Sequence, residues 1–300
     1  MFLGILSAGT AFTLWGIFPL YLKLLKSVPS LEILSHRVMW SAIFLGLILA
    51  YRRQWDWMQS IRARPRIALA FVTSAAMLGA NWVIYIWAVN TDRIVDASLG
   101  YFIAPLFNVL FGVLLGERLK PIQWIAITLA GIGVAWLTLS SGELPWIGLV
   151  LAVTFSLYGL IRKTAALGAL EGLSVETLVM LPLAALFLLL PDSGSSHAFA
   201  SGSVSLMLML VAAGPVTAVP LLLFAFGARR IPLSVVGLLQ YIGPSLQMML
   251  GVWLYHEAFG INRQIGFALI WTALALYSVE ALWRAWRPAA ANPSADPDAQ

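Results

Sequence analysis

The chain contains no cysteine and unusually few charged residues. Zero cysteine excludes disulfides, thiolate metal sites and cysteine nucleophiles. Only 10% of the 300 residues are charged and 61% are hydrophobic, whereas soluble domains carry about 25% charged residues. The composition therefore indicates an integral membrane protein.

The sequence also lacks the motifs of common enzymes. It has no Gly-x-Ser-x-Gly elbow, no His-Glu-x-x-His zinc pair and no Walker phosphate loop. Its three histidines, His36, His197 and His256, fall in separate segments without metal-ligand spacing. The net charge of +5 is spread between apolar runs instead of gathering on a basic module. We therefore expect no enzyme, no cofactor, no metal site and no nucleic-acid partner.

Apolar runs long enough to cross a bilayer as helices occur ten times. A crossing needs about 17–25 apolar residues, and short connections with proline, glycine or basic residues separate the runs. The sequence predicts an all-α protein with ten transmembrane helices and a disordered cytoplasmic tail at 288–300. The expected helices are 2–22, 31–50, 67–90, 94–115, 121–139, 144–161, 173–190, 204–227, 232–254 and 264–283.

Lysine and arginine gather on one side of this ten-helix arrangement. Positively charged residues near helix ends favour the cytoplasmic side, so the richer side is predicted to be cytoplasmic, with both termini on it. The richer side holds Arg52, Arg53, Arg62, Arg64, Arg66, Arg118, Lys120, Arg162, Lys163, Arg229, Arg230, Arg284 and Arg287, and the poorer side holds Lys23, Lys26, Arg93 and Arg263.

The two halves of the chain repeat several landmarks. The string FTLWGI at 12–17 returns as FSLYGL at 155–160, and Glu32 is echoed by Glu176. An odd number of helices per repeat inverts the second copy in the membrane, as in many secondary transporters. We therefore predict two inverted five-helix repeats, at 1–140 and 141–287. Pro105, Gly112 and Glu117 also align with Pro244, Gly251 and Glu257 if one extra residue is allowed before the second glutamate.

Five strings resemble the RarD-type branch of the EamA family in the drug/metabolite transporter superfamily. They are EILSHRVMW at 32–40, GANWVIYIWAVN at 79–90, ASLGYFIAP at 97–105, YGLIRK at 158–163 and QYIGP at 240–244. The resemblance covers nearly the whole chain. It implies a permease of the bacterial inner (plasma) membrane with a central cavity between the repeats and outward transport, but it brings no substrate. The sequence Tyr255-His256-Glu257 departs from the Leu115-Gly116-Glu117 pattern, so the two glutamates need not play equivalent roles.

Polar and aromatic residues inside the apolar runs predict a substrate pocket near the midplane. Unpaired polar groups are costly in hydrocarbon, so they usually face a bundle interior or a watery cavity. The predicted binding residues are Trp15, Asn81, Tyr85, Tyr101, Asn108, Tyr158 and Gln240. Interhelical hydrogen bonding and ordinary aromatic packing remain open alternatives. Without an evident unpaired charge at mid-depth, we expect a neutral, zwitterionic or amphipathic solute.

Four ionisable residues near the ends of the second and seventh helices are candidates for gating or coupling. Glu32, His36 and Arg37 lie in the first turns of the second expected helix, and Glu176 is the repeat counterpart of Glu32. Inversion places the two glutamates at opposite mouths, where each would pair when its side closes. Basic neighbours expected for Glu32 are Arg37, Lys23 or Lys26. A structural ion pair that anchors the helix end is the alternative, and H+ is a possible coupling ion.

The pattern as a whole favours a secondary transporter that moves a small organic metabolite or drug by alternating access. The alternative is a polytopic membrane sensor or assembly factor that does not transport. An intramembrane enzyme ranks third, because the helices lack a paired catalytic constellation. The expected partners are a small-molecule substrate and the lipid bilayer, and the sequence does not determine the oligomeric state.

Overall fold

The computed structural model describes residues 2–53, 55, 57–58, 61, 64–114, 121–164, 167–189, 199, 203–228, 230–231 and 239–286. Within these residues the chain forms ten helical spans, which confirms the predicted all-α architecture. The spans are α1 (Phe2–Leu24), α2 (Ser30–Arg52), α4 (Pro65–Asn90), α5 (Ile94–Leu114), α6 (Pro121–Ser141), α7 (Trp146–Thr164), α8 (Ala169–Leu189), α10 (Val204–Ala228), α12 (Ile242–Met249) with the π-helical turn η1 (Leu250–Leu254), and α13 (Ile261–Trp286).

Length and composition make most of these helices membrane-crossing elements. Six described helices are long and apolar enough to span a bilayer, and Ile94–Phe107, Trp146–Arg162 and Ile242–Leu254 form shorter apolar helices. Many large hydrophobic side chains lie exposed on the outside of the bundle, among them Leu139 and Leu183. Exposed apolar surface of this kind suits contact with lipid.

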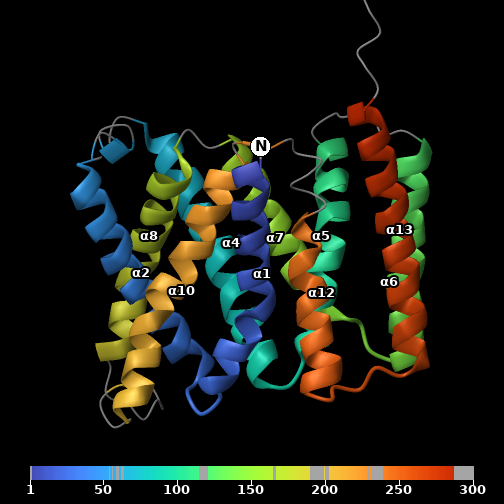
Figure 1. The fold of residues 1–300 in the computed structure, drawn as a ribbon, viewed down its shortest axis with the longest axis horizontal. Coiled ribbons are helices and arrows are strands. Elements are labelled where there is room, and N and C mark those ends of the chain that lie inside the picture. The colour runs from blue at the N-terminus through green and yellow to red at the C-terminus, as the bar shows by residue number, and fades with distance from the viewer. Residues whose placement is uncertain are drawn as a thin grey trace, which may run out of the picture.

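The helices stand side by side, and the chain crosses the bundle back and forth (Figure 1). The start of α1 and the end of α13 therefore lie on the same side, which we call the N-terminal side. The end of α1 lies on the opposite side, which we call the Lys23 side. Helices α6 and α13 form one edge of the bundle, while α2, α8 and α10 form the other.

The helix contacts follow the repeat that the sequence suggested. Helix α1 packs against α10 and α12, and its counterpart α7 packs against α4 and α5. Counterparts also contact each other directly, since α2 packs on α8 and α6 packs on α13. The two halves are thus arranged as inverted repeats, with a domain boundary at residues 140 and 141 remaining a prediction.

Glycines permit the closest of these crossings. A Cβ atom on Gly100 of α5 would lie 2.7 Å from the backbone oxygen of Gly148 on α7. In the matching α1–α12 crossing, a Cβ on Gly16 would lie 2.8 Å from the Cβ of Leu246 and 3.2 Å from the oxygen of Gly243. Small residues let helix backbones approach in this way where hydrocarbon provides no hydrophobic drive for association.

The π-helical turn occupies the place where the second repeat has its extra residue. Residues Leu250–Leu254 form this turn, and Tyr255 and His256 separate it from Glu257. A π-helical turn accommodates one residue more than an α-helical turn, usually at a functional position. The turn lies in the segment from Gly251 to Glu257, whose sequence spacing exceeds that from Gly112 to Glu117 by one residue.

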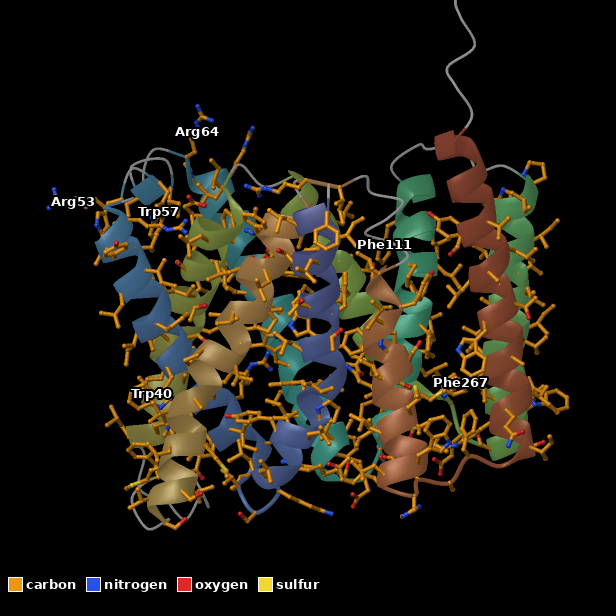
Figure 2. The ribbon with its side chains drawn as sticks, viewed as in Figure 1. Trp40, Arg53, Trp57, Arg64, Phe111 and Phe267 are labelled. Carbon is orange, nitrogen blue, oxygen red and sulfur yellow. The ribbon has the colours of Figure 1, made fainter. Side chains whose placement is uncertain are left out.

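Side chains project into the spaces between the helices (Figure 2). Phe267 on α13 points toward α5, where its ring meets that of Phe102 edge-on with centroids 6.2 Å apart. This contact joins the peripheral α6–α13 pair to the rest of the bundle.

Candidate functional site

A cavity of about 540 Å³ lies between the two repeats. Its wall comes from α1, α2, α4 and α5 of the first half and from α7, α8, α10 and α12 of the second. Six of the seven residues predicted to bind substrate line it, namely Trp15, Asn81, Tyr85, Tyr101, Tyr158 and Gln240. The side chain of the seventh, Asn108, lies outside the described residues.

Asn81 joins three helices at the cavity wall. Its Nδ2 donates to the backbone oxygen of Leu151 at 3.1 Å and to Oγ1 of Thr154 at 3.0 Å, both on α7. Its Oδ1 accepts from the hydroxyl of Tyr101 on α5 at 3.1 Å. Only 2% of Asn81 is exposed. Both its amide nitrogen and its amide oxygen are hydrogen-bonded within the protein, so Asn81 connects α4 to α5 and α7 as well as lining the cavity.

Tyr85 keeps an unused polar group beside Tyr101. Its hydroxyl is buried without a hydrogen-bond partner in the described structure. Its ring stacks on Phe18 at 6.1 Å and meets the ring of Tyr101 edge-on at 5.7 Å. The aromatic ring is thus fixed by packing, and its hydroxyl is an unsatisfied polar group of a residue that lines the cavity.

Aromatic side chains cover both repeat faces of the cavity. Trp15 lies within 6 Å of Phe12 and Phe224, and Tyr158 lies 6.2 Å from Phe155. Trp15 and Tyr158, the matched residues of the FTLWGI and FSLYGL strings, therefore face the same cavity from opposite repeats. Mostly apolar walls with a few polar groups are typical of small-molecule sites.

Gln247 also belongs to the cavity, although sequence reasoning did not select it. Its Nε2 donates to the backbone oxygen of Trp15 at 3.0 Å, which ties α12 to α1. Its Oε1 is buried without a partner in the described structure. Its position three residues after Pro244, one turn along the same helix, was the signal available in the sequence.

Arg37 lines the cavity, which places a cation inside the bundle. Its side chain leaves α2 in a buried stripe that includes Ile33, Ser41 and Leu45, each one helical turn apart. Its Nε donates to Oγ1 of Thr217 on α10 at 2.7 Å, and Cζ lies 4.0 Å from the ring centroid of Trp82. The sequence pointed to Arg37 as a gating residue, whereas the structure makes it part of the wall.

Glu176 forms a buried cluster behind the wall on the N-terminal side. Its carboxylate, which has no exposed surface, accepts from Ser74 Oγ at 2.5 Å and from the hydroxyl of Tyr158 at 3.4 Å. The Nε of Arg162 lies 3.7 Å from the same carboxylate, and its Nη2 donates to the oxygen of Gly168. The predicted gating residue Glu176 is thus connected to the cavity through Tyr158 and Arg162, which both line it.

The cavity ends at different depths on the two sides. On the N-terminal side it reaches Leu167 and Gly168 in the α7–α8 connection. Toward the Lys23 side it stops at Phe18, Arg37 and Tyr85. Beyond these residues a cluster of buried side chains fills the bundle, including Leu22, Leu25, Val28, Ile33, Ile86, Val89 and Ile94.

Ion pairs cover this cluster on the Lys23 side. Both Lys23 and Lys26 at the end of α1 pair with Asp92 in the α4–α5 connection, and Arg263 pairs with Asp96 at 3.2 Å. The expectation that Lys23, Lys26 or Arg37 pairs with Glu32 is therefore wrong, because the two lysines bind Asp92 and Arg37 faces the cavity. The hydrogen bonds that Lys23 and Lys26 donate to Asp92 lower the pKa of its carboxyl below its usual value of 3.8.

Glu257 caps the start of α5 from the second repeat. Its carboxylate accepts from the backbone N–H groups of Ile94 at 2.7 Å and Val95 at 2.8 Å. A negative charge at a helix N-terminus satisfies free N–H groups and is favoured by the helix dipole. Burial nevertheless outweighs these bonds and raises the pKa of Glu257 above its usual value of 4.5.

Glu32 and His36 do not line the cavity. Both are buried, and the ring of His36 packs against Phe199 with centroids 5.0 Å apart. Of the four candidate gating residues, only Arg37 reaches the cavity directly. A gating or coupling role for the other three stays a prediction.

The sequence is similar to that of known membrane transporters. Residues 2–139 match the EamA-like transporter family. The chain is 44% identical to "Protein RarD" of Escherichia coli (strain K12) over 282 residues, which covers 93% of this chain and 95% of that protein. It is 46% identical to an "Uncharacterized transporter" of Vibrio cholerae over 281 residues, with 93% of each chain covered.

A solved crystal structure shares the fold. It is 22% identical, superposes with a TM-score of 0.61, and covers 93% of this chain and 98% of its own. Family membership rests on the closer relatives, of which "Protein RarD" of Streptomyces exfoliatus is 44% identical over 98% of this chain and 94% of that protein. The chain belongs to the EamA-like family of multi-pass membrane transporters and is not an enzyme.

Proposed function

We propose that the protein is a secondary transporter that carries a small organic solute across the bacterial plasma membrane by alternating access through this cavity. The main support for this proposal is the cavity between the inverted repeats. It reaches the N-terminal side of the bundle and is closed off from the Lys23 side. A pathway of this kind needs a second arrangement in which the closed side opens.

The open side is proposed to be cytoplasmic. The cavity reaches the α7–α8 connection, which lies on the N-terminal side. Arg53 and Arg64 project from the same side (Figure 2), and positive charge at helix ends favours the cytoplasm. Both termini would then be cytoplasmic, and the structure would represent the state open to the cytoplasm.

Two polar layers are proposed to gate the pathway. Lys23, Lys26 and Asp92 close the external side here, and their separation would let a solute leave outward. Glu176 and Arg162 stand beside the internal mouth. Glu176 is also the proposed site for a coupling proton, since it connects through Tyr158 to the cavity wall.

Reconstituted vesicles test the transport proposal. We expect a solute loaded inside the vesicles to accelerate uptake of the same labelled solute from outside, and a pH gradient to alter the rate. Glu176→Gln should remove the dependence on the gradient while counterflow persists. Binding without flux across a broad metabolite panel would favour a sensor or assembly factor instead.

Single cysteines test alternating access, because the chain contains none of its own. Leu167→Cys reports on the side that is open here, and exposed Thr91→Cys reports on the Lys23 side. A transported solute should change thiol labelling at the two positions in opposite directions. Equal labelling with and without solute at both positions would contradict the gating scheme.

A further inference from the structure

We propose that the cavity binds an organic anion, a carboxylate carried on an aromatic or otherwise apolar body, through the guanidinium group of Arg37. The proposal deepens the proposed function, because it names the class of solute for the same cavity.

Arg37 is a buried cation without a protein anion. It is 6% exposed, and in the part of the chain that the structure describes it makes no ion pair. Arg162 shows the contrast, since Glu176 lies beside its guanidinium. An isolated buried charge is strongly unfavourable unless a counter-charge or hydrogen bonds compensate it.

The protein contacts of Arg37 leave Nη1, one of its two outer nitrogens, without a hydrogen-bond partner in the described structure. Nε binds Thr217 at 2.7 Å, and the guanidinium lies 4.0 Å from the ring centroid of Trp82 and 4.9 Å from that of Phe18. Arginine has five N–H donors, and Nη1 is buried without a partner in the described structure. Thr217 and the two rings fix the direction of the group, and the remaining donors can form a bidentate pair with a carboxylate.

The rest of the wall selects against a positive charge on the solute. The described residues that line the cavity include no aspartate or glutamate. An amine or a zwitterion would therefore leave its ammonium group without a counter-charge, whereas a monoanion matches Arg37. The sequence-based expectation was a neutral, zwitterionic or amphipathic solute, and its premise was the absence of an unpaired charge at mid-depth. The proposal keeps the amphipathic alternative and replaces the other two.

Two residues of other helices that line the cavity also carry unsatisfied polar groups. The hydroxyl of Tyr85 and Oε1 of Gln247 are buried without partners in the described structure, and both residues line the cavity. The aromatic side chains of Phe12, Trp15, Phe155 and Phe224 supply flat apolar walls. A cavity of about 540 Å³ lies within the size range of sites that bind small organic molecules.

Four probes with one phenylpropyl body test the charge preference in the unaltered protein. They are 3-phenylpropionate, its neutral amide, 3-phenylpropylamine and zwitterionic phenylalanine. Affinity is measured from the concentration dependence of the melting temperature in detergent. We expect 3-phenylpropionate to bind about tenfold or more tightly than each of the others, since hydrogen bonds to charged groups are the stronger ones. Equal or tighter binding of the amide, amine or zwitterion, or no binding of the anion, would overturn the proposal.

Variants of Arg37 assign the preference to this residue. Arg37→Gln should weaken binding of 3-phenylpropionate about 10- to 100-fold and leave the amide nearly unchanged, while Arg37→Lys should retain part of the preference. Arg230→Gln, at an exposed arginine outside the cavity, is the matched control. Loss of anion selectivity in the control, or its full retention in Arg37→Gln, would overturn the assignment.

Binding and flux separate this proposal from the proposed function. Selective binding of the anion without flux contradicts transport and leaves the anion site standing. Flux of neutral solutes that does not depend on Arg37 contradicts the anion site and leaves transport standing.

Discussion

Replacement of Gly172 by alanine tests whether the Arg162–Glu176 pair depends on one missing side chain. A Cβ atom at Gly172 would lie 1.6 Å from Nη1 of Arg162, 2.6 Å from Cζ and 2.8 Å from Nη2. The guanidinium must therefore move. We expect the movement to break the Nη2 bond to the oxygen of Gly168, which is 3.2 Å long, and to separate Nε from Glu176.

The expected cost follows from the burial of Glu176. Removing one partner of a buried ion pair costs about 3–5 kcal/mol, because the other charge stays behind uncompensated. Arg162 is displaced here and not removed, its side chain is 17% exposed, and Ser74 still binds the carboxylate. We therefore expect Gly172→Ala to lower the free energy of unfolding by about 1–3 kcal/mol, below the cost of full removal.

A double-mutant cycle in detergent measures whether the methyl group acts through Arg162. In an Arg162→Met background, Gly172→Ala should cost much less than in the parent, because the clash is with the guanidinium. Gly46→Ala is the matched control, since a Cβ there meets no heavy atom within 4 Å. The same loss of stability in both backgrounds would refute the reasoning and place the clash elsewhere.

Three further variants test the packing, the external ion pairs and the aromatic cavity wall. Gly100→Ala should destabilise the bundle by about 1–3 kcal/mol in a denaturant titration, because its Cβ meets the backbone oxygen of Gly148 at 2.7 Å, whereas Gly131→Ala meets nothing within 4 Å and should not. Asp92→Asn should lose the two ion pairs with the lysines, and its deficit in the free energy of unfolding relative to the parent should stay constant from pH 8 to 5. The deficit should disappear only as the pH falls through the lowered pKa of Asp92, below 3.8, because the parent carboxylate is then protonated. Trp15→Ala should weaken binding of an aromatic solute several-fold in a fluorescence or melting assay, by about 0.5–1.5 kcal/mol for one lost aromatic contact; an unchanged affinity would remove Trp15 from the site.

Much of the architecture could be predicted from the sequence. The expected helices 94–115 and 121–139 correspond to Ile94–Leu114 and Pro121–Ser141, because helix length and hydropathy are properties of about twenty consecutive residues. The repeat of FTLWGI as FSLYGL placed Trp15 and Tyr158 at matching positions, and both line one cavity. Polar groups inside apolar runs are rarely left facing hydrocarbon, and this rule selected the amide and hydroxyl residues of the cavity. Trp15 was selected as the repeat counterpart of Tyr158.

Tertiary structure decided which of those polar groups are already bonded. The amide of Asn81 is used by Leu151, Thr154 and Tyr101, whereas the hydroxyl of Tyr85 on the next turn of α4 has no partner in the described structure. The two residues look equivalent along the chain. Only the rotation and depth of α5 and α7 against α4 distinguish them.

The tertiary structure also decided which charged residues pair. Sequence proximity suggested Lys23 or Lys26 as an ion-pair partner of Glu32. In the structure both lysines pair with Asp92, which lies in the α4–α5 connection, far from them in the sequence. Arg37 binds Thr217, 180 positions away, and lines the cavity. Composition and periodicity by themselves determined a ten-helix membrane protein, because those signals are local. The counter-charge that each ion meets depends on helices from both repeats, and the fold alone decided that Arg37 meets none among the described residues.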